Sequence, residues 1–131
     1  MRSIQAYQEL FSTHLQSMAL VKEPLGLYDP ISYILKLGGK RMRPVLALMA
    51  CDALGKNPSS ALSVATAVEL FHNFTLLHDD IMDEASLRRG QQTVHQKWDV
   101  NTGILSGDAL LVIAYQQLNQ YEDTLFSQLT K

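Results

Sequence analysis

The chain has 131 residues, of which 47% are hydrophobic and 18% charged, a composition typical of a globular domain and not of a disordered chain. Its formal net charge of −2 gives no overall electrostatic reason to expect binding to nucleic acid or to an anionic membrane. The single cysteine, Cys51, excludes an intrachain disulfide and a thiolate zinc cluster. Because no apolar run is long enough to span a bilayer or to form a signal peptide, we expect a cytoplasmic protein without a transmembrane segment.

The first third of the chain predicts two helices separated by a connection. Apolar residues recur at helical spacing over residues 4–18 and predict a first amphipathic helix. A connection follows, because turn-forming residues cluster there: Pro24, Gly26, Asp29 and Pro30. A short helix is then predicted over about residues 31–37, ending at Gly38 and Gly39, since glycine commonly terminates helices.

The remainder of the chain also has helical patterns. An apolar helix is predicted over residues 44–54, and a long buried helix over about 58–83, with Asn57 as its cap and Pro58 at its first position. After a basic loop at residues 88–90 come a short helix over about 94–98 and a long helix from about 104. No alternating strand pattern or domain-scale repeat is visible. The sequence therefore predicts an all-α fold in a single helical domain over residues 1–131.

Three carboxylates form the sharpest charged cluster in the sequence: Asp79, Asp80 and Asp83. On a helix, spacings of three and four residues bring them to one side, where like charges repel. They also lie at the predicted C-terminal end of a helix, where the helix dipole disfavours anions. A cation would relieve both costs, and ligand sets made only of oxygen suit Mg²⁺, which also binds substrate phosphates. A solvated acidic helix end would have the same pattern, so the spacing alone leaves both interpretations open.

Two basic clusters flank these carboxylates along the chain. Lys40, Arg41 and Arg43 lie at a predicted helix N-terminus, whose free backbone N–H groups can bind an anion. Arg88 and Arg89 follow the carboxylates, and arginine binds phosphate through two parallel hydrogen bonds. Either cluster alone is more often a solvated surface than a site. Together with the carboxylates, in a chain of net charge −2, they indicate a polyphosphate ligand bridged by a metal.

Four motifs in this order resemble the trans-isoprenyl diphosphate synthases: Gly38-Gly39-Lys40-Arg41-x-Arg43-Pro44, Glu69-x-x-His72, Leu77-His78-Asp79-Asp80-x-x-Asp83 and Arg88-Arg89-Gly90. The carboxylate motif alone is weak evidence, because terpene cyclases share it. The ordered set is specific for the condensing enzymes, which are Mg²⁺-dependent prenyl transferases. The resemblance implies that the chain is the N-terminal part of the isoprenoid synthase helical bundle.

The resemblance also implies a role for individual residues. Asp79 and Asp83 would bind the Mg²⁺ ions that hold the diphosphate of an allylic substrate, with Asp80 assisting as a third catalytic carboxylate. Arg88 would contact the same allylic diphosphate. The diphosphate of isopentenyl diphosphate would be held by Lys40, Arg43, His72 and Arg89. In such enzymes the allylic diphosphate ionises, and the isopentenyl double bond attacks the allylic cation.

Product length and assembly are implied in the same way. The family limits product length by a steric floor upstream of the carboxylates, which here implicates Phe74 and Thr75, with Phe71 a further turn away. A phenylalanine on a buried helix is also ordinary core, so the sequence leaves both interpretations open. Family members usually form homodimers, and a homodimer is the expected assembly.

Three alternatives compete with this resemblance. Glu69-x-x-His72 would suit half of a di-iron site, but no second motif of this kind occurs. A His-Asp phosphohydrolase would account for His78 and Asp79 but would leave the Gly-Gly-Lys-Arg segment unexplained. The third alternative is an incomplete or non-catalytic unit that binds substrate or a partner subunit without turnover. Family members carry a second Asp-rich segment, and the acids after Asp108 do not form one: Glu122 and Asp123.

Overall fold

The computed structural model describes residues 2–18, 20, 22–119 and 121. Its elements in chain order are α1 (Ile4–Ser17), α2 (Leu25–Lys36), α3 (Met42–Ala53), the 3-10 turn η1 (Pro58–Ala61), α4 (Leu62–Met82), β1 (Leu87–Arg88), β2 (Gln91–Gln92), α5 (Val94–Lys97) and α6 (Val100–Leu118). The predicted helical fold is confirmed, with one short hairpin added to it. The part of the predicted last helix that falls on residues 122–131 lies outside the described residues.

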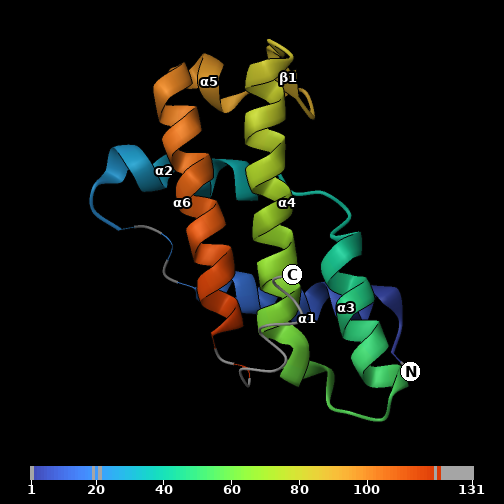
Figure 1. The fold of residues 1–131 in the computed structure, drawn as a ribbon. Coiled ribbons are helices and arrows are strands. Elements are labelled where there is room, and N and C mark those ends of the chain that lie inside the picture. The colour runs from blue at the N-terminus through green and yellow to red at the C-terminus, as the bar shows by residue number, and fades with distance from the viewer. Residues whose placement is uncertain (1, 19, 21, 120, 122–131) are drawn as a thin grey trace.

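Helix α4 lies at the centre of the molecule (Figure 1). Helix α6 runs antiparallel beside it, α3 lies on its other side, and α1 and α2 cross behind these helices. Two clusters of buried side chains form the core, and α4 contributes to both. Leu70 and Leu77 of α4 belong to the cluster shared with α2, α5 and α6, whereas Ala65 belongs to the cluster shared with α1 and α3. Every segment that carries a predicted site residue therefore packs around α4.

The start of α2 differs from the prediction. The helix begins at Leu25, so the stretch predicted as a connection is helical, with Pro30 inside the helix. Proline removes one backbone hydrogen bond within a helix. Here the loss is offset by burial, because Pro30 is part of an apolar stripe that packs into the core with Ile31, Ile34 and Leu35.

The segment predicted as a basic loop is a hairpin. Leu87 pairs with Gln92 and Arg88 with Gln91 in an antiparallel ladder, and Arg89 and Gly90 form the two-residue turn. Both turn residues have positive φ, 51° at Arg89 and 77° at Gly90, which is the backbone geometry of a type I′ hairpin turn. Strands of two residues are too short to show an alternating pattern, so the hairpin could not be predicted from the sequence.

Two helix starts also differ from the prediction. The turn at Pro58–Ala61 is a 3-10 helix, and α4 proper starts at Leu62, although Asn57 caps the turn as predicted, its side chain accepting from the Ser59 N–H at 3.0 Å. Helix α6 starts at Val100, not at 104, because the Asp99 carboxylate accepts from the Thr102 N–H at 2.7 Å.

Helices α4 and α6 approach each other closely beside the carboxylates. A Cβ atom added to Gly107 would lie 2.6 Å from His78 Nε2, and one added to Gly103 would lie 2.9 Å from Ile81 Cδ1. The absence of these side chains lets His78 Nε2 lie 3.2 Å from the carbonyl oxygen of Ile104. The predicted absence of a transmembrane segment agrees with the described helices, none of which combines the length and apolarity needed to cross a bilayer.

Candidate functional site

The predicted site residues on α4 fall into two stripes along the helix. His72 and Asp79 are seven residues apart and Asp79 and Asp83 four, so all three lie within about 40° of one another around the helix axis. We call them the outer stripe: Asp79 and Asp83 are exposed, and His72 is half-buried. Glu69, Asn73 and Asp80 form a second, inner stripe, whose members are 5%, 3% and 6% exposed. The two stripes separate side chains that can meet a ligand from side chains that cannot.

The two outer carboxylates lie at the C-terminal end of α4, where Asp83 is the capping residue. Neither carboxylate group takes part in a hydrogen bond or an ion pair among the described residues. Mg²⁺ in phosphoryl sites commonly uses one or two carboxylates and takes its other ligands from water and substrate phosphates. Asp79 and Asp83 fit that requirement. No group of three metal-ligating side chains converges in the described residues, so these two carboxylates do not form an all-protein metal site.

Asp80 is turned away from these two carboxylates and pairs with Arg88 of the hairpin. Arg88 Nε and Nη2 each donate to one carboxylate oxygen at 2.8 Å, a bidentate contact. This hydrogen bonding raises the pKa of Arg88 above its usual value. Asp80 therefore holds the hairpin on α4.

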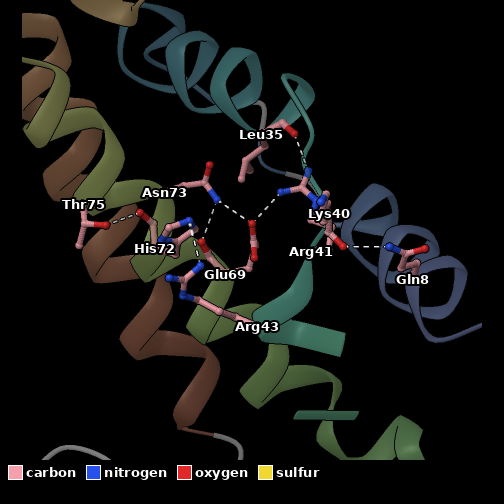
Figure 2. Close-up of polar contacts among 9 residues, drawn as sticks. All are labelled: Gln8, Leu35, Lys40, Arg41, Arg43, Glu69, His72, Asn73 and Thr75. Carbon is pink, nitrogen blue, oxygen red and sulfur yellow. Dashed lines mark hydrogen bonds and ion pairs between the residues drawn. The ribbon is translucent and has the colours of Figure 1, made fainter. Parts of the chain in front are cut away.

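A second buried arginine pair lies further along the inner stripe (Figure 2). Arg41 Nη1 lies 2.9 Å from Glu69 Oε1, and its Nη2 donates to the carbonyl oxygen of Leu35 at 2.6 Å. Asn73 Nδ2 donates to Glu69 Oε1 at 3.1 Å and to the Glu69 carbonyl at 2.8 Å. The side chains of Arg41 and Glu69 are only 11% and 7% exposed. This network holds the basic segment, residues 40–43, against α4.

His72 lies beside Arg43 and within reach of the charges of Arg88 and Arg89. Arg43 Nη1 lies 3.3 Å from His72 Nε2, and a guanidinium can only donate, so Nε2 accepts and the ring is neutral. Burial lowers the pKa of His72, and the positive charges of Arg43, Arg89 and Arg88 lower it further. On the other side of the segment, the Arg89 guanidinium covers Gly39, since a Cβ atom there would lie 2.5 Å from Arg89 Nη1.

The five predicted cations thus divide into two classes. Arg41 and Arg88 are neutralised by the inner stripe. Three others form no ion pair with any carboxylate in the described part of the chain: Lys40, Arg43 and Arg89. Lys40 and Arg43 are exposed, and Gln8 of α1 supports the segment by donating to the Lys40 carbonyl at 2.9 Å. Cations without a carboxylate partner raise the local positive potential, which attracts anions.

The three candidates for limiting product length lie on α4 close to His72: Phe71 directly precedes it, and Phe74 and Thr75 follow within one turn. The rings of Phe71 and Phe74 are 5.6 Å apart, and Phe74 packs edge-on against His78 at 4.7 Å. Phe71 is 47% exposed, which separates it from ordinary core. The Thr75 hydroxyl donates to the carbonyl of His72 at 2.6 Å, so it is engaged by its own helix.

Sequence reasoning assigned no role to Asn73, and it treated Glu69 only as part of a motif. The signal that could have identified them was their spacing, because Glu69, Asn73 and Asp80 recur as polar residues on the otherwise apolar side of a buried helix. A separate cavity of about 470 Å³ lies between α1 and α2 and is lined partly by Arg41, but by none of the three aspartates.

Comparison with known proteins identifies the relatives of this chain. The Polyprenyl synthetase family pattern matches residues 25–131. A geranylgeranyl pyrophosphate synthase of Geoglobus acetivorans is 44% identical over 111 residues, which are 85% of this chain and 35% of the relative. A chloroplastic geranylgeranyl pyrophosphate synthase of Arabidopsis thaliana is 40% identical over 112 residues, which are 84% of this chain and 31% of the relative.

Solved structures agree with these sequence matches. A crystal structure of a geranylgeranyl pyrophosphate synthase superposes with a TM-score of 0.95 at 54% identity, covering 98% of this chain and 39% of that protein. The chain therefore spans about a third of the length of the relatives that it matches. Since one of these relatives is chloroplastic, the cytoplasmic location stays a prediction.

Proposed function

The chain belongs to the polyprenyl synthetase family, and we propose that it carries the diphosphate-binding side of a prenyl transferase active site. The proposed reaction condenses isopentenyl diphosphate with an allylic diphosphate in the presence of Mg²⁺. One observation carries the proposal: Arg43 and Arg89, which have no carboxylate partner among the described residues, lie beside a neutral His72, about two and three helical turns from the unpaired Asp79 and Asp83 on the same stripe of α4. The chain would form the N-terminal portion of a polyprenyl synthetase domain.

Isopentenyl diphosphate is assigned to the basic end of the outer stripe. Lys40, Arg43 and Arg89 would neutralise its diphosphate, and His72 would donate through Nδ1, since its Nε2 accepts from Arg43. The support is that no carboxylate among the described residues competes for these cations. Because these three cations would neutralise the diphosphate directly, this end of the site needs no metal ion.

The allylic diphosphate is assigned to the acidic end. Asp79 and Asp83 would hold Mg²⁺, which stabilises the negative charge that develops on a departing diphosphate. Arg88 bonds Asp80 through Nε and Nη2, so its Nη1 is the nitrogen that can reach the substrate. In this proposal Asp80 contributes by orienting Arg88, which refines the metal-assisting role that the resemblance implied.

The proposed chemistry needs both ends together. The allylic carbon–oxygen bond breaks, and the bonding pair leaves with the diphosphate. The isopentenyl double bond then forms the new carbon–carbon bond to the allylic cation, and the released diphosphate accepts the proton lost from the product. The residues of this chain contribute by placing the two anions about 10 Å apart along α4, the rise from His72 to Asp79.

Product length is assigned to the aromatic surface that Phe71 and Phe74 form on α4. Phe71 and Phe74 project from the two helical turns that precede Asp79, and Phe74 is the proposed floor for a growing prenyl chain. In a complete enzyme, Phe74→Ala should lengthen the products, and an unchanged product distribution would contradict the assignment.

A second function has a specific observation in its favour. The chain spans about a third of the length of these relatives, so their full activity is a proposal for it, and the alternative proposal is a unit that binds substrate or a partner subunit without turnover. A homodimer remains the proposed assembly. Exposed apolar residues of α6, including Leu105, Val112 and Tyr115, are surfaces on which a second copy could pack.

Calorimetric titration with an unreactive allylic diphosphate analogue, with and without Mg²⁺, tests the proposal. We expect binding that requires Mg²⁺ and is lost in Asp79→Ala. A turnover assay with both substrates then separates the enzyme from the binding unit. Binding that is equally strong without Mg²⁺, or no binding, would contradict the assignment of the acidic end.

A further inference from the structure

We propose that Arg41 and Glu69 are positioning residues that lock the segment carrying Lys40 and Arg43 in the conformation that binds the isopentenyl diphosphate group. This inference rests on the proposed function and adds to it two residues that never touch the ligand. In the sequence, Arg41 is one of three similar cations in a basic segment. In the structure it is the one whose charge is already neutralised.

The guanidinium of Arg41 joins three helices. Its Nη2 donates to the carbonyl of Leu35, in the last turn of α2, which also accepts from the Gly38 N–H at 3.3 Å. Its Nη1 pairs with Glu69 of α4. The backbone of Arg41 is itself the N-cap of α3. The relative placement of these three helix segments therefore depends on one side chain (Figure 2).

The backbone of Arg41 needs this support. It has φ 55° and ψ 36°, the left-handed conformation, which residues other than glycine seldom adopt. No side chain caps the N-terminus of α3 at this position. The ion pair with Glu69 and the hydrogen bond to Leu35 therefore stabilise a backbone conformation that is unfavourable for an arginine without such contacts. That conformation sets the direction in which the residues on either side project.

The residues on either side are the proposed ligands. Lys40 precedes Arg41 directly, and Arg43 follows two residues later and reaches His72. Glu69 and His72 are three residues apart on α4. One turn of this helix therefore carries both the carboxylate that holds Arg41 and the histidine that would face the ligand. Asn73 fixes the carboxylate of Glu69 in turn. Loss of the pair should therefore displace Lys40 and Arg43 relative to His72.

Two roles for Arg41 predict opposite results when Glu69 is neutralised. If Arg41 positions the segment, Glu69→Gln should weaken binding of isopentenyl diphosphate, because the segment is released. If Arg41 contacts the ligand directly, Glu69→Gln should leave binding unchanged or strengthen it, because the guanidinium is freed. The change keeps the size of the side chain, and Asn73 can still donate to the remaining amide oxygen.

The experiment is calorimetric titration of the full chain with isopentenyl diphosphate alone, which cannot react without an allylic partner. We expect Kd to rise about 10- to 100-fold in Glu69→Gln and in Arg41→Lys, the scale typical of groups that orient others. Lys40→Ala should weaken binding as loss of a direct contact, and Glu9→Gln, the same change at an exposed carboxylate of α1, should not. Binding as tight as in the unchanged chain in both Glu69→Gln and Arg41→Lys, with Lys40→Ala still weakened, would overturn the positioning role and leave the proposed function intact.

A variant that replaces both Arg41 and Glu69 shows whether weaker binding is caused by loss of the ion pair or by unfolding. Arg41→Met combined with Glu69→Met leaves no unpaired buried charge, and apolar replacement of a whole ion pair is often neutral for stability. We expect this variant to melt close to the unchanged chain but to bind isopentenyl diphosphate as weakly as Glu69→Gln. Tight binding by a stably folded double variant would overturn the inference.

Hydrogen exchange of backbone amides tests, without any ligand, whether the Arg41–Glu69 pair holds the basic segment in place. The inference can therefore be decided even if isopentenyl diphosphate does not bind and the proposed function fails. The N–H groups of Gly38 and Val45 are bonded within or beside the segment, to Leu35 and Arg41. In Glu69→Gln, their exchange should accelerate more than that of the core amide of Leu110. Equal acceleration at all three amides would show a general loss of stability and would contradict a local lock.

Discussion

The two buried arginine–carboxylate pairs on the inner stripe of α4 hold different segments in different surroundings. Glu69 pairs with Arg41 near the middle of the helix, where both side chains are almost fully enclosed, at 7% and 11% exposure. Asp80 pairs with Arg88 near the C-terminal end, where the arginine is 25% exposed. One pair holds the basic segment before α3, and the other holds the hairpin after α4.

This difference shows how similar arginines acquire different roles. Inside the protein, Arg41 donates one hydrogen bond to Glu69 and another to the backbone carbonyl of Leu35. Arg88 gives two parallel donors to Asp80 at the edge of the molecule, which leaves it partly exposed to a ligand. The first arginine supports the site, and the second is placed both to support the hairpin and to contact a substrate.

The largest effect is expected from leaving Arg41 unpaired. Glu69→Ala should lower the free energy of unfolding by about 3–5 kcal/mol, because a buried charge remains without a partner. Urea denaturation measures this loss. Replacing both Arg41 and Glu69 by methionine should recover most of it, and a loss below about 1 kcal/mol in Glu69→Ala would show that Arg41 reaches water easily.

A smaller loss of stability is expected at the other pair. Asp80→Asn should cost about 1–3 kcal/mol, because Arg88 is partly solvated and can recover hydrogen bonds to water. The same denaturation series measures it. If Asp80→Asn costs as much as Glu69→Ala or more, the two arginines do not differ in the way proposed.

The outer stripe should behave in the opposite way. Asp79→Asn should raise the free energy of unfolding by about 0.2–0.5 kcal/mol, because it relieves repulsion from neighbouring carboxylates and removes a negative charge from the helix C-terminus. The same variant should lose Mg²⁺-dependent binding of an allylic diphosphate analogue. A clear loss of stability would indicate that Asp79 has a structural role like that of Asp80.

The smallest effect is expected from His72 and depends on pH. Burial and the charge of Arg43 lower its pKa below the unfolded value of 6.5, so the unfolded chain takes up a proton that the folded chain resists. The contribution of His72 to stability should therefore be constant above pH 6.5 and should fall as the pH drops through 6.5 towards the lower folded pKa. His72→Gln should remove this part of the pH dependence in denaturation curves. An identical pH dependence in both chains would contradict a lowered pKa.

Much of the fold could be predicted from sequence, because apolar periodicity, Asn57 and the paired glycines at 38 and 39 are local signals. The early start of α2 could not be predicted, because Pro30 is tolerated only through its packing in the finished core. The hairpin could not be predicted because its strands are two residues long, and its turn carries Arg89 where asparagine is more usual.

The candidate site was predictable as a set of residues but not as an arrangement. Sequence placed all five cations in two equivalent basic clusters. The structure distinguishes Arg41 and Arg88 through partners that lie 28 and 8 residues away, and no local pattern shows which cation a distant carboxylate will neutralise. For the same reason Asp80 could not be separated from Asp79 and Asp83, although it lies on a different stripe of the same helix.

The central claim is that the outer stripe of α4 has two separate diphosphate sites, of which only one needs a metal. The most direct test is to follow backbone amide signals by NMR while isopentenyl diphosphate is added without Mg²⁺, and then an unreactive allylic analogue with Mg²⁺. We predict that the first ligand shifts the signals of residues 38–43 and His72, and that the second shifts those of Asp79, Asp83 and Arg88. Shifts of the same residues by both ligands, or an isopentenyl response that appears only with Mg²⁺, would contradict the account.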